Sequence, residues 1–141
     1  MALQQFLYDL LKSDPALNSI GYTEEGLFAA ESPDSPRANL SKWIVIRWGV
    51  VAPAIARDVR SRGRDVTIWA YNREPDFGPI NNALNRINDL LLSLGTVDTG
   101  SGWITEAVDT GSSEDLYDDG YQAVTRNWSY RIIASEGAFN G

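Results

Sequence analysis

The clearest hydrophobic pattern in the chain is a strand followed by a helix, between residues 64 and 95. Apolar residues alternate with other types in the first part, which predicts a strand: Val66, Ile68 and Ala70. Apolar residues then recur at helical spacing, which predicts a helix over 79–94: Ile80, Ala83, Leu84, Ile87, Leu90, Leu91 and Leu94. Pro79 suits the first turn of this helix, and Gly95 suits the left-handed position just past its end. A strand and an amphipathic helix in this order indicate a helix packed on a sheet.

The N-terminal half shows a second helix and the strongest strand signal. A helix is predicted over 2–12 from apolar residues on one face: Leu3, Phe6, Leu7, Leu10 and Leu11. Residues 26–30 suit a short strand. Residues 42–51 are rich in Trp, Ile and Val on both faces, which predicts a central strand or one covered by a neighbouring subunit. Residues 54–63 are expected to be an Arg-rich connection to the 64–72 strand, so that the two strands form a long hairpin arm.

The C-terminal part is predicted to hold two strands and a loop. Residues 103–109 suit a strand with Ile104 and Val108 on one face, and residues 110–120 suit a polar, acidic loop. Residues 121–134 show a period-two alternation between two sets of side chains over an unusual length, and they are expected to form the last strand.

The order of these elements predicts an α+β fold. A mostly antiparallel β-sheet would carry two main helices, about 2–12 and 79–94, packed on one face. At 141 residues the chain is long enough to bury a core and suits a single domain, 1–141.

Composition excludes much of the chemistry that proteins use. The chain has no Cys and no His, which removes disulfides, thiol catalysis, His-based triads and the usual zinc, copper and haem sites. An EF-hand beginning at Asp115 fails, because its third position is Tyr117 and its twelfth is Arg126. A looser carboxylate site for Mg²⁺ or Ca²⁺ stays an alternative to an exposed acidic loop. We expect no catalytic residues, no metal and no cofactor, and therefore no enzyme.

The sequence suits a soluble chain. Residues 2–12 are amphipathic and lack the charged and apolar regions of a signal peptide. The longest apolar run, 48–56, is far too short to span a membrane.

Charge is unevenly distributed along the chain. The formal net charge is −7, and residues 87–125 hold eight acidic residues and no basic one. Four arginines fall within eight positions of the expected connection: Arg57, Arg60, Arg62 and Arg64. Arg suits paired contacts better than Lys does, so this cluster is predicted to contact another subunit or a partner. An acidic segment is predicted to receive it or to face a lumen: Asp109, Glu114, Asp115, Asp118 and Asp119. The alternative is two solvated loops. With a net charge of −7 we do not expect direct, tight binding to nucleic acid, which needs a clustered positive surface.

Aromatic residues are more numerous than one small core requires. The chain has five Trp and six Tyr. Such residues concentrate at protein interfaces, so Trp48, Trp69 and Trp128 are predicted as anchors of a subunit or tube interface. The alternative is a core rich in Trp.

The chain resembles siphophage tail terminator (tail completion) proteins over nearly its whole length. The resemblance begins with the first helix running into the sequence LLKSDPAL at 10–17, and continues through the strand near 43–48. It includes the strand at 64–71, the helix at 79–94 and the sequence DLYDDGY at 115–121 before the last strand. The stretch 52–63 matches nothing in that family, so an interface there rests on charge alone.

The resemblance implies a structural virion protein without enzyme activity or cofactor. In that family a small α+β subunit forms a hexameric ring at the head-proximal end of the tail tube, stops tube polymerisation and joins the tail to the head connector. The implied partners are further copies of the chain, the tail tube protein, and a connector or stopper protein. DNA would pass through the lumen without specific binding, and the protein would reside in the host cytoplasm during assembly. Two alternatives stay open: another neck component, such as a head-completion or stopper protein, and a monomeric ligand-binding or enzymatic α+β domain.

Overall fold

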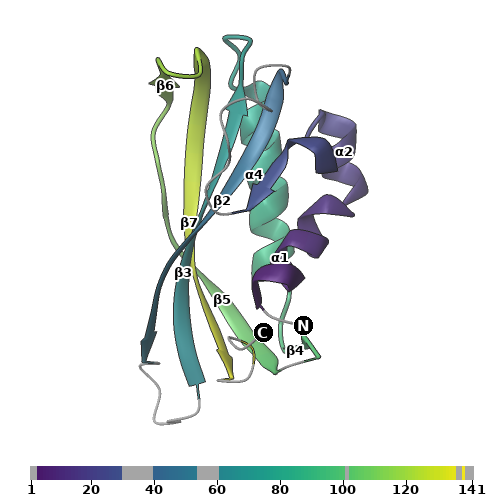
Figure 1. Ribbon diagram of the computed structural model, residues 1–141, viewed down its shortest axis with the longest axis vertical. Helices are drawn as coiled ribbons and strands as arrows, with labels where there is room; N and C mark the ends of the chain where they lie inside the picture. The colour runs from purple at the N-terminus through teal and green to yellow at the C-terminus, as the bar shows by residue number, and fades with distance from the viewer. Residues whose placement is uncertain (1–2, 30–39, 54–60, 101, 136–137, 139–141) are drawn as a thin grey trace.

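A computed structural model describes residues 3–29, 40–53, 61–100, 102–135 and 138. It confirms the predicted α+β class, with the helices on one face of a mostly antiparallel sheet (Figure 1). The elements in chain order are α1 (Leu3–Lys12), α2 (Pro15–Ile20), η1 (Glu24–Gly26), β1 (Leu27–Ala29), β2 (Lys42–Pro53), β3 (Ser61–Asn72), α4 (Gly78–Leu92), β4 (Val97–Asp98), β5 (Trp103–Ser112), β6 (Leu116–Asp118) and β7 (Ala123–Ser135).

The described residues form seven strands of one twisted sheet. Six of them follow the order β1-β2-β3-β7-β5-β4, and β6 pairs with β7. β1 runs parallel to β2, and every other pairing is antiparallel. In Figure 1, β6 and β7 lie to the left of β2 at the upper end of the sheet, whereas β2 lies to the left of β7 at the lower end. This reversal is the accumulated twist of long strands.

The helices cover one face of the sheet, here called the near face. α1 contributes Leu3, Leu7 and Leu11, and α4 contributes the predicted stripe of Ile80, Ala83, Leu84, Ile87 and Leu91. These side chains pack with the apolar residues that β2, β3 and β7 direct to the same side. Gly95 has a φ of +63°, as its place after the helix predicts. None of the described helices is long and apolar enough to cross a membrane.

The opposite face, here called the far face, carries a second and smaller cluster. Trp43, Val45, Tyr71 and Ala123 are buried there, at the upper end of the sheet. The rings of Trp43 and Tyr71 stack with 4.9 Å between centroids and 7° between planes. The two faces of β2 therefore contact two different clusters, which explains why its sequence is apolar on both faces.

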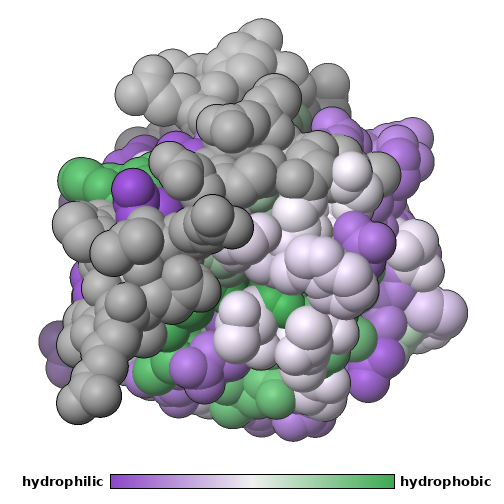
Figure 2. Space-filling model, turned by 90° about the horizontal axis from the view of Figure 1, so that it is seen from below, coloured by the Kyte–Doolittle hydropathy of each residue, from purple (hydrophilic) through white to green (hydrophobic). Residues whose placement is uncertain are grey.

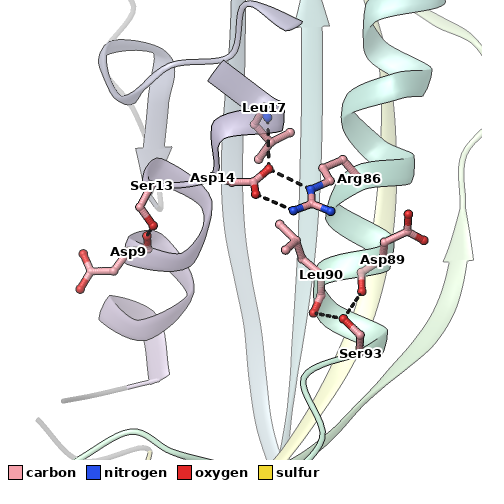
Figure 3. Close-up of polar contacts among 8 residues, drawn as sticks. All are labelled: Asp9, Ser13, Asp14, Leu17, Arg86, Asp89, Leu90 and Ser93. Atoms are coloured by element: carbon pink, nitrogen blue, oxygen red, sulfur yellow. Dashed lines mark hydrogen bonds and ion pairs between the residues drawn. The ribbon is translucent and has the colours of Figure 1, made fainter. Parts of the chain in front are cut away.

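A buried carboxylate joins the short helix α2 to α4 (Figure 3). Asp14 is 6% exposed and precedes α2, where its Oδ2 accepts a hydrogen bond from the backbone N–H of Leu17 at 3.1 Å. Arg86 on α4 donates to both carboxylate oxygens, at 3.0 and 2.8 Å. These bonds, together with the N–H of Leu17, hold the pKa of Asp14 below its ordinary value. Asp14 thus caps one helix and fixes its position against another.

Two predicted loops are wrong in part, because the strands are longer than the sequence pattern indicated. β3 begins at Ser61, so Arg62 lies in a strand rather than in the connection predicted over 54–63. The predicted acidic loop over 110–120 contains the end of β5 and all of β6. Backbone pairing with β2 and β7 determines these strand ends, and the polar side chains in these segments do not reveal it.

The prediction that Ile104 and Val108 share a face is also wrong. Ile104 lies opposite Ala134, whereas Val108 lies opposite Arg131, because a register shift falls between Ile104 and Glu106. An extra residue in one strand reverses the alternation beyond it. Ile104 is therefore buried on the near face, and Val108 is 40% exposed on the far face.

Candidate interaction surface

The lower end of the β2–β3 hairpin carries the described part of the predicted Arg cluster. In Figure 1 the lower ends of β2 and β3 extend below α1 and α4, whereas Arg64 itself lies beside Gln4 of α1. Arg64 places its guanidinium 5.2 Å from the ring centroid of Trp48 and donates from Nε to the carbonyl of Gly49 at 3.2 Å. A guanidinium over an indole face is a favourable cation–π contact. Arg64 is thereby held beside the outer strand of the hairpin.

Of the other three arginines of the cluster, the structure describes one. Arg62 is half-buried in β3, opposite Pro53 on one side and Ala134 on the other. Arg57 and Arg60 lie outside the described residues. The structure therefore places two of the four arginines on the same strand, two residues apart and on the same face.

The predicted aromatic anchors are all partly buried within the chain. Trp48 and Trp128 pack against the near-face core, and Trp69 packs against the far-face cluster. Trp69 stacks on Tyr71 and Trp128 on Tyr130, each with 6.3 Å between centroids. Each ring thus has contacts of its own within the chain and a remaining exposed part.

The predicted acidic residues divide into two groups. Asp109 lies in β5 and accepts hydrogen bonds from Nε1 of Trp128 at 2.7 Å and from the N–H of Gly111 at 2.8 Å. Around β6, Asp115 lies 3.6 Å from Nε of Arg126, and Asp118 accepts from the N–H of Tyr121 at 3.1 Å. The remaining two, Glu114 and Asp119, are exposed.

The Arg cluster and most of the acidic residues lie far apart in one subunit. Arg64 is paired with Ile132 of β7, whereas Asp118 is paired with Ala123 of the same strand. The interval from 123 to 132 is nine residues, about 30 Å at about 3.3 Å per residue. Asp109 is different, because it is paired with Tyr130 and so lies near the level of Arg64. An ion pair between Arg64 and the β6 acids would therefore need a second copy of the chain.

Sequence analysis missed the most exposed apolar residues. Large hydrophobic side chains with high exposure among the described residues are Val50 (77%), Tyr117 (61%), Trp103, Leu92, Val51 and Val108. Val50 and Val51 lie on β2, Trp103 and Val108 on β5, and Tyr117 on β6. None comes from the central strands β3 and β7. Figure 2 shows hydrophobic and hydrophilic residues side by side at the lower end of the molecule.

Register irregularities explain why the pattern did not reveal these residues. The pairing of β2 with β3 shifts between Trp48 and Val51, which places Val50 at the bulge. Bulges are common at sheet edges and redirect side chains. The one signal in the sequence is Gly49, since an isolated glycine within a strand often marks a bulge, but it does not show which neighbouring side chain becomes exposed.

Two ionisable side chains near this surface have shifted pKa values. The described residues contain no group of three or more His, Cys, Asp or Glu side chains that could hold a metal ion. The pKa of Tyr130 is raised, first by burial and then by the charges of Asp109 and Asp89. The pKa of Asp65 is lowered, mainly by hydrogen bonds from Arg131. Both shifts stabilise the usual neutral tyrosine and ionised aspartate, so neither group is poised to exchange protons near neutral pH.

Comparison with known proteins finds similarity to solved structures. No protein-family model and no curated protein sequence matches the chain. A chain from the solved virion of a native gene transfer agent particle has a similar fold, with a TM-score of 0.70 and 16% sequence identity. The alignment covers 95% of this chain and 95% of that one. At this identity the similarity shows the fold.

Proposed function

We propose that this protein is a structural component of a phage-like virion, and specifically a tail terminator. Its copies form a ring, most simply of six, at the head-proximal end of the tail tube. The ring stops tube polymerisation and joins the tail to the head connector or a stopper protein. Residues 1–141 act as one domain without enzymatic activity.

The observation that carries the proposal is the full-length similarity to a virion chain. The alignment covers 95% of each chain, so the similarity extends over the whole fold and not over a single motif. The tail terminator is the more specific choice because the order of the helices and strands agrees with the family that the sequence resembles. A virion chain of this fold can also be another neck component, and contact with the tail tube distinguishes the two.

The charge and surface of the molecule support the proposal. Apolar and charged residues lie on the strands at both sides of the sheet, where a ring subunit meets its neighbours. The net charge of −7 and the exposed acids around β6 suit a channel through which DNA passes without binding, because phosphates are repelled from negative surfaces.

The decisive experiment adds the purified protein to polymerising tail tubes of the particle that encodes it. A terminator shortens the distribution of tube lengths, and cryo-electron microscopy shows a closed ring at one end of each tube. The matched control is Leu84→Asp, which we expect not to fold and therefore not to cap. If the protein binds the head connector but never the tube, it is a head-completion or stopper protein. If it stays monomeric with tubes and connectors alike, the proposal is wrong.

A further inference from the structure

The two sides of the sheet each present an unpaired strand edge in the described chain. β1 covers β2 only at Ile44, Val45 and Ile46, so the outer edge of β2 from Arg47 onward has no described strand beside it. β4 covers β5 only at Trp103 and Ile104, so the outer edge of β5 from Glu106 onward also has no described strand beside it. Free N–H and C=O groups along an edge readily accept another strand.

The two edges also lie at the same level of the sheet. Val51, Arg64, Ile132 and Ala107 are successive partners across four strands, from β2 through β3 and β7 to β5. Val50 and Val51 on one side are therefore level with Ala107 and Val108 on the other. Identical sheets placed side by side would bring these apolar residues together with little displacement along the strands.

The charges at the two edges are opposite on each face. On the near face, Arg64 is held beside β2 by Trp48, and Asp109 lies on β5. On the far face, Arg47 is exposed on β2, and Glu106 is exposed on β5. The β2 side thus presents a positive charge to both faces and the β5 side a negative one. A second β2 edge would be repelled by the first, whereas a β5 edge is attracted.

We propose that the β2 edge of one copy packs against the β5 edge of the next copy, head to tail. The contact joins Val50 to Val108 and Val51 to Ala107, with Arg64 and Asp109 on the near face within about two residues of the same level. The two surfaces differ, so the contact is heterologous and repeats from copy to copy until a ring closes or a filament grows. The register shifts in both strands restrict backbone pairing to a short stretch such as Glu106–Asp109, which limits uncontrolled edge pairing.

This interface rests on the self-association in the proposed function but not on its role in the tail. A chain that assembles through these edges without capping tubes would support the interface and contradict the terminator. A chain that caps tubes through other surfaces would do the reverse.

The absence of cysteine from the sequence permits a clean cross-linking test. Val50→Cys and Val108→Cys proteins are prepared separately, mixed, and treated with a short thiol-specific cross-linker, with and without tail tubes. We expect a covalent heterodimer from the mixture and little product from either variant alone. The matched control is Leu92→Cys, which is also exposed but lies at the end of α4. Cross-linking of Val50→Cys to itself, equal cross-linking to Leu92→Cys, or no heterodimer under either condition would overturn the interface.

A charge exchange tests the same contact independently. Arg64→Glu and Asp109→Arg should each lower the heterodimer yield by about fivefold, as expected for a surface ion pair. Both changes in one chain should restore the yield to within about twofold. If the double variant is as weak as the single ones, the two residues do not face each other and the assigned edges are wrong.

Discussion

The near face of the sheet is covered by α1, α2 and α4, whereas the far face has one aromatic cluster at its upper end and polar contacts below it. β7 illustrates the difference within two residues. Tyr130 is fully buried under α4 and donates to Asn88 at 3.0 Å, while Arg131 on the far face is half-exposed and pairs with Asp65 at 2.8 Å. Below the aromatic cluster, Thr67 and Ser129 make a further polar contact across the strands at 3.0 Å.

This contrast shows that one sheet can bury the side chains that stabilise the fold on one face and leave the other face largely in contact with solvent. Burial of apolar area contributes most of the folding free energy, and it is concentrated on the near face. Polar pairs on an open face contribute little, because water competes for each group. Substitutions of similar chemistry on the two faces should therefore differ strongly in effect.

The largest effect is expected from a charge placed in the near-face core. Leu84→Asp or Leu91→Asp should abolish folding, because an unpaired buried carboxylate costs several kcal/mol, comparable to the ~5–15 kcal/mol stability of a domain. Leu92→Asp is the matched control, since its neighbour Leu91 is 1% exposed and Leu92 is 48% exposed. Circular dichroism and urea unfolding measure the result. A folded Leu91→Asp protein would show that the stripe is not core.

The second effect concerns the aromatic cluster of the far face. Trp43→Ala should lower the free energy of unfolding by about 3–5 kcal/mol, because it removes a fully buried ring that stacks on Tyr71. Trp43→Phe should cost much less, since it keeps a ring and removes an indole N–H that has no hydrogen-bond partner among the described residues. Trp103→Phe, at an exposed position, is the control. Equal losses for Ala and Phe would mean that the cluster contributes through the indole alone.

A medium effect is expected where Asp14 joins α2 to α4. Asp14→Ala removes both the helix cap and the acceptor for Arg86, and should lower the free energy of unfolding by about 1–2 kcal/mol. Asp9→Ala is the control, because Asp9 is a half-exposed residue of α1 that pairs with Lys12 at 3.5 Å. If both variants lose the same stability in urea, burial of the Asp14 carboxylate adds nothing.

The contribution of Asp14 should also depend on pH. Its pKa in the folded chain is lowered from the ordinary value of 3.8, first by the hydrogen bond from Arg86. A lowered folded pKa means that the stabilisation is fully present above about pH 4 to 5 and is lost as pH falls through the folded pKa. The difference in unfolding free energy between the native chain and Asp14→Asn should therefore shrink between pH 6 and pH 2, in urea titrations at about one-unit steps. A constant difference would contradict the assignment.

The smallest effect is expected for the ion pair on the far face. Removing Asp65 and Arg131 singly and together should give a coupling free energy below about 1 kcal/mol, since both side chains remain partly in water. The coupling should fall further in high salt because exposed charges are screened. A double-mutant cycle at two salt concentrations measures it. A coupling as large as the effect of Trp43→Ala would remove the distinction between the two faces.

The sequence by itself determined the helices, the approximate strands and the fold class. Offsets of three and four predicted α1 and α4 because helical side chains on one face meet the sheet together, and alternation predicted β3 and β7 for the same reason at period two. Both patterns depend only on residues close together in the sequence, so the sequence alone reveals them. The sequence also showed that arginines and acidic residues are segregated along the chain, though not where the two groups lie relative to each other in space.

Only the tertiary structure decided which strands lie at the edges and which side chains the register shifts expose. Val50 and Val108 lie within strand segments, and their exposure follows from a shift against the partner strand, β3 or β7. The separation of Arg64 from the acids around β6 likewise follows from the length of β7, which pairs with both segments. Register is a relation between segments, set by the sum of their pairings. The core is therefore readable from the periodicity of single segments, whereas the surface proposed for contact between copies arises only when the strands are placed side by side.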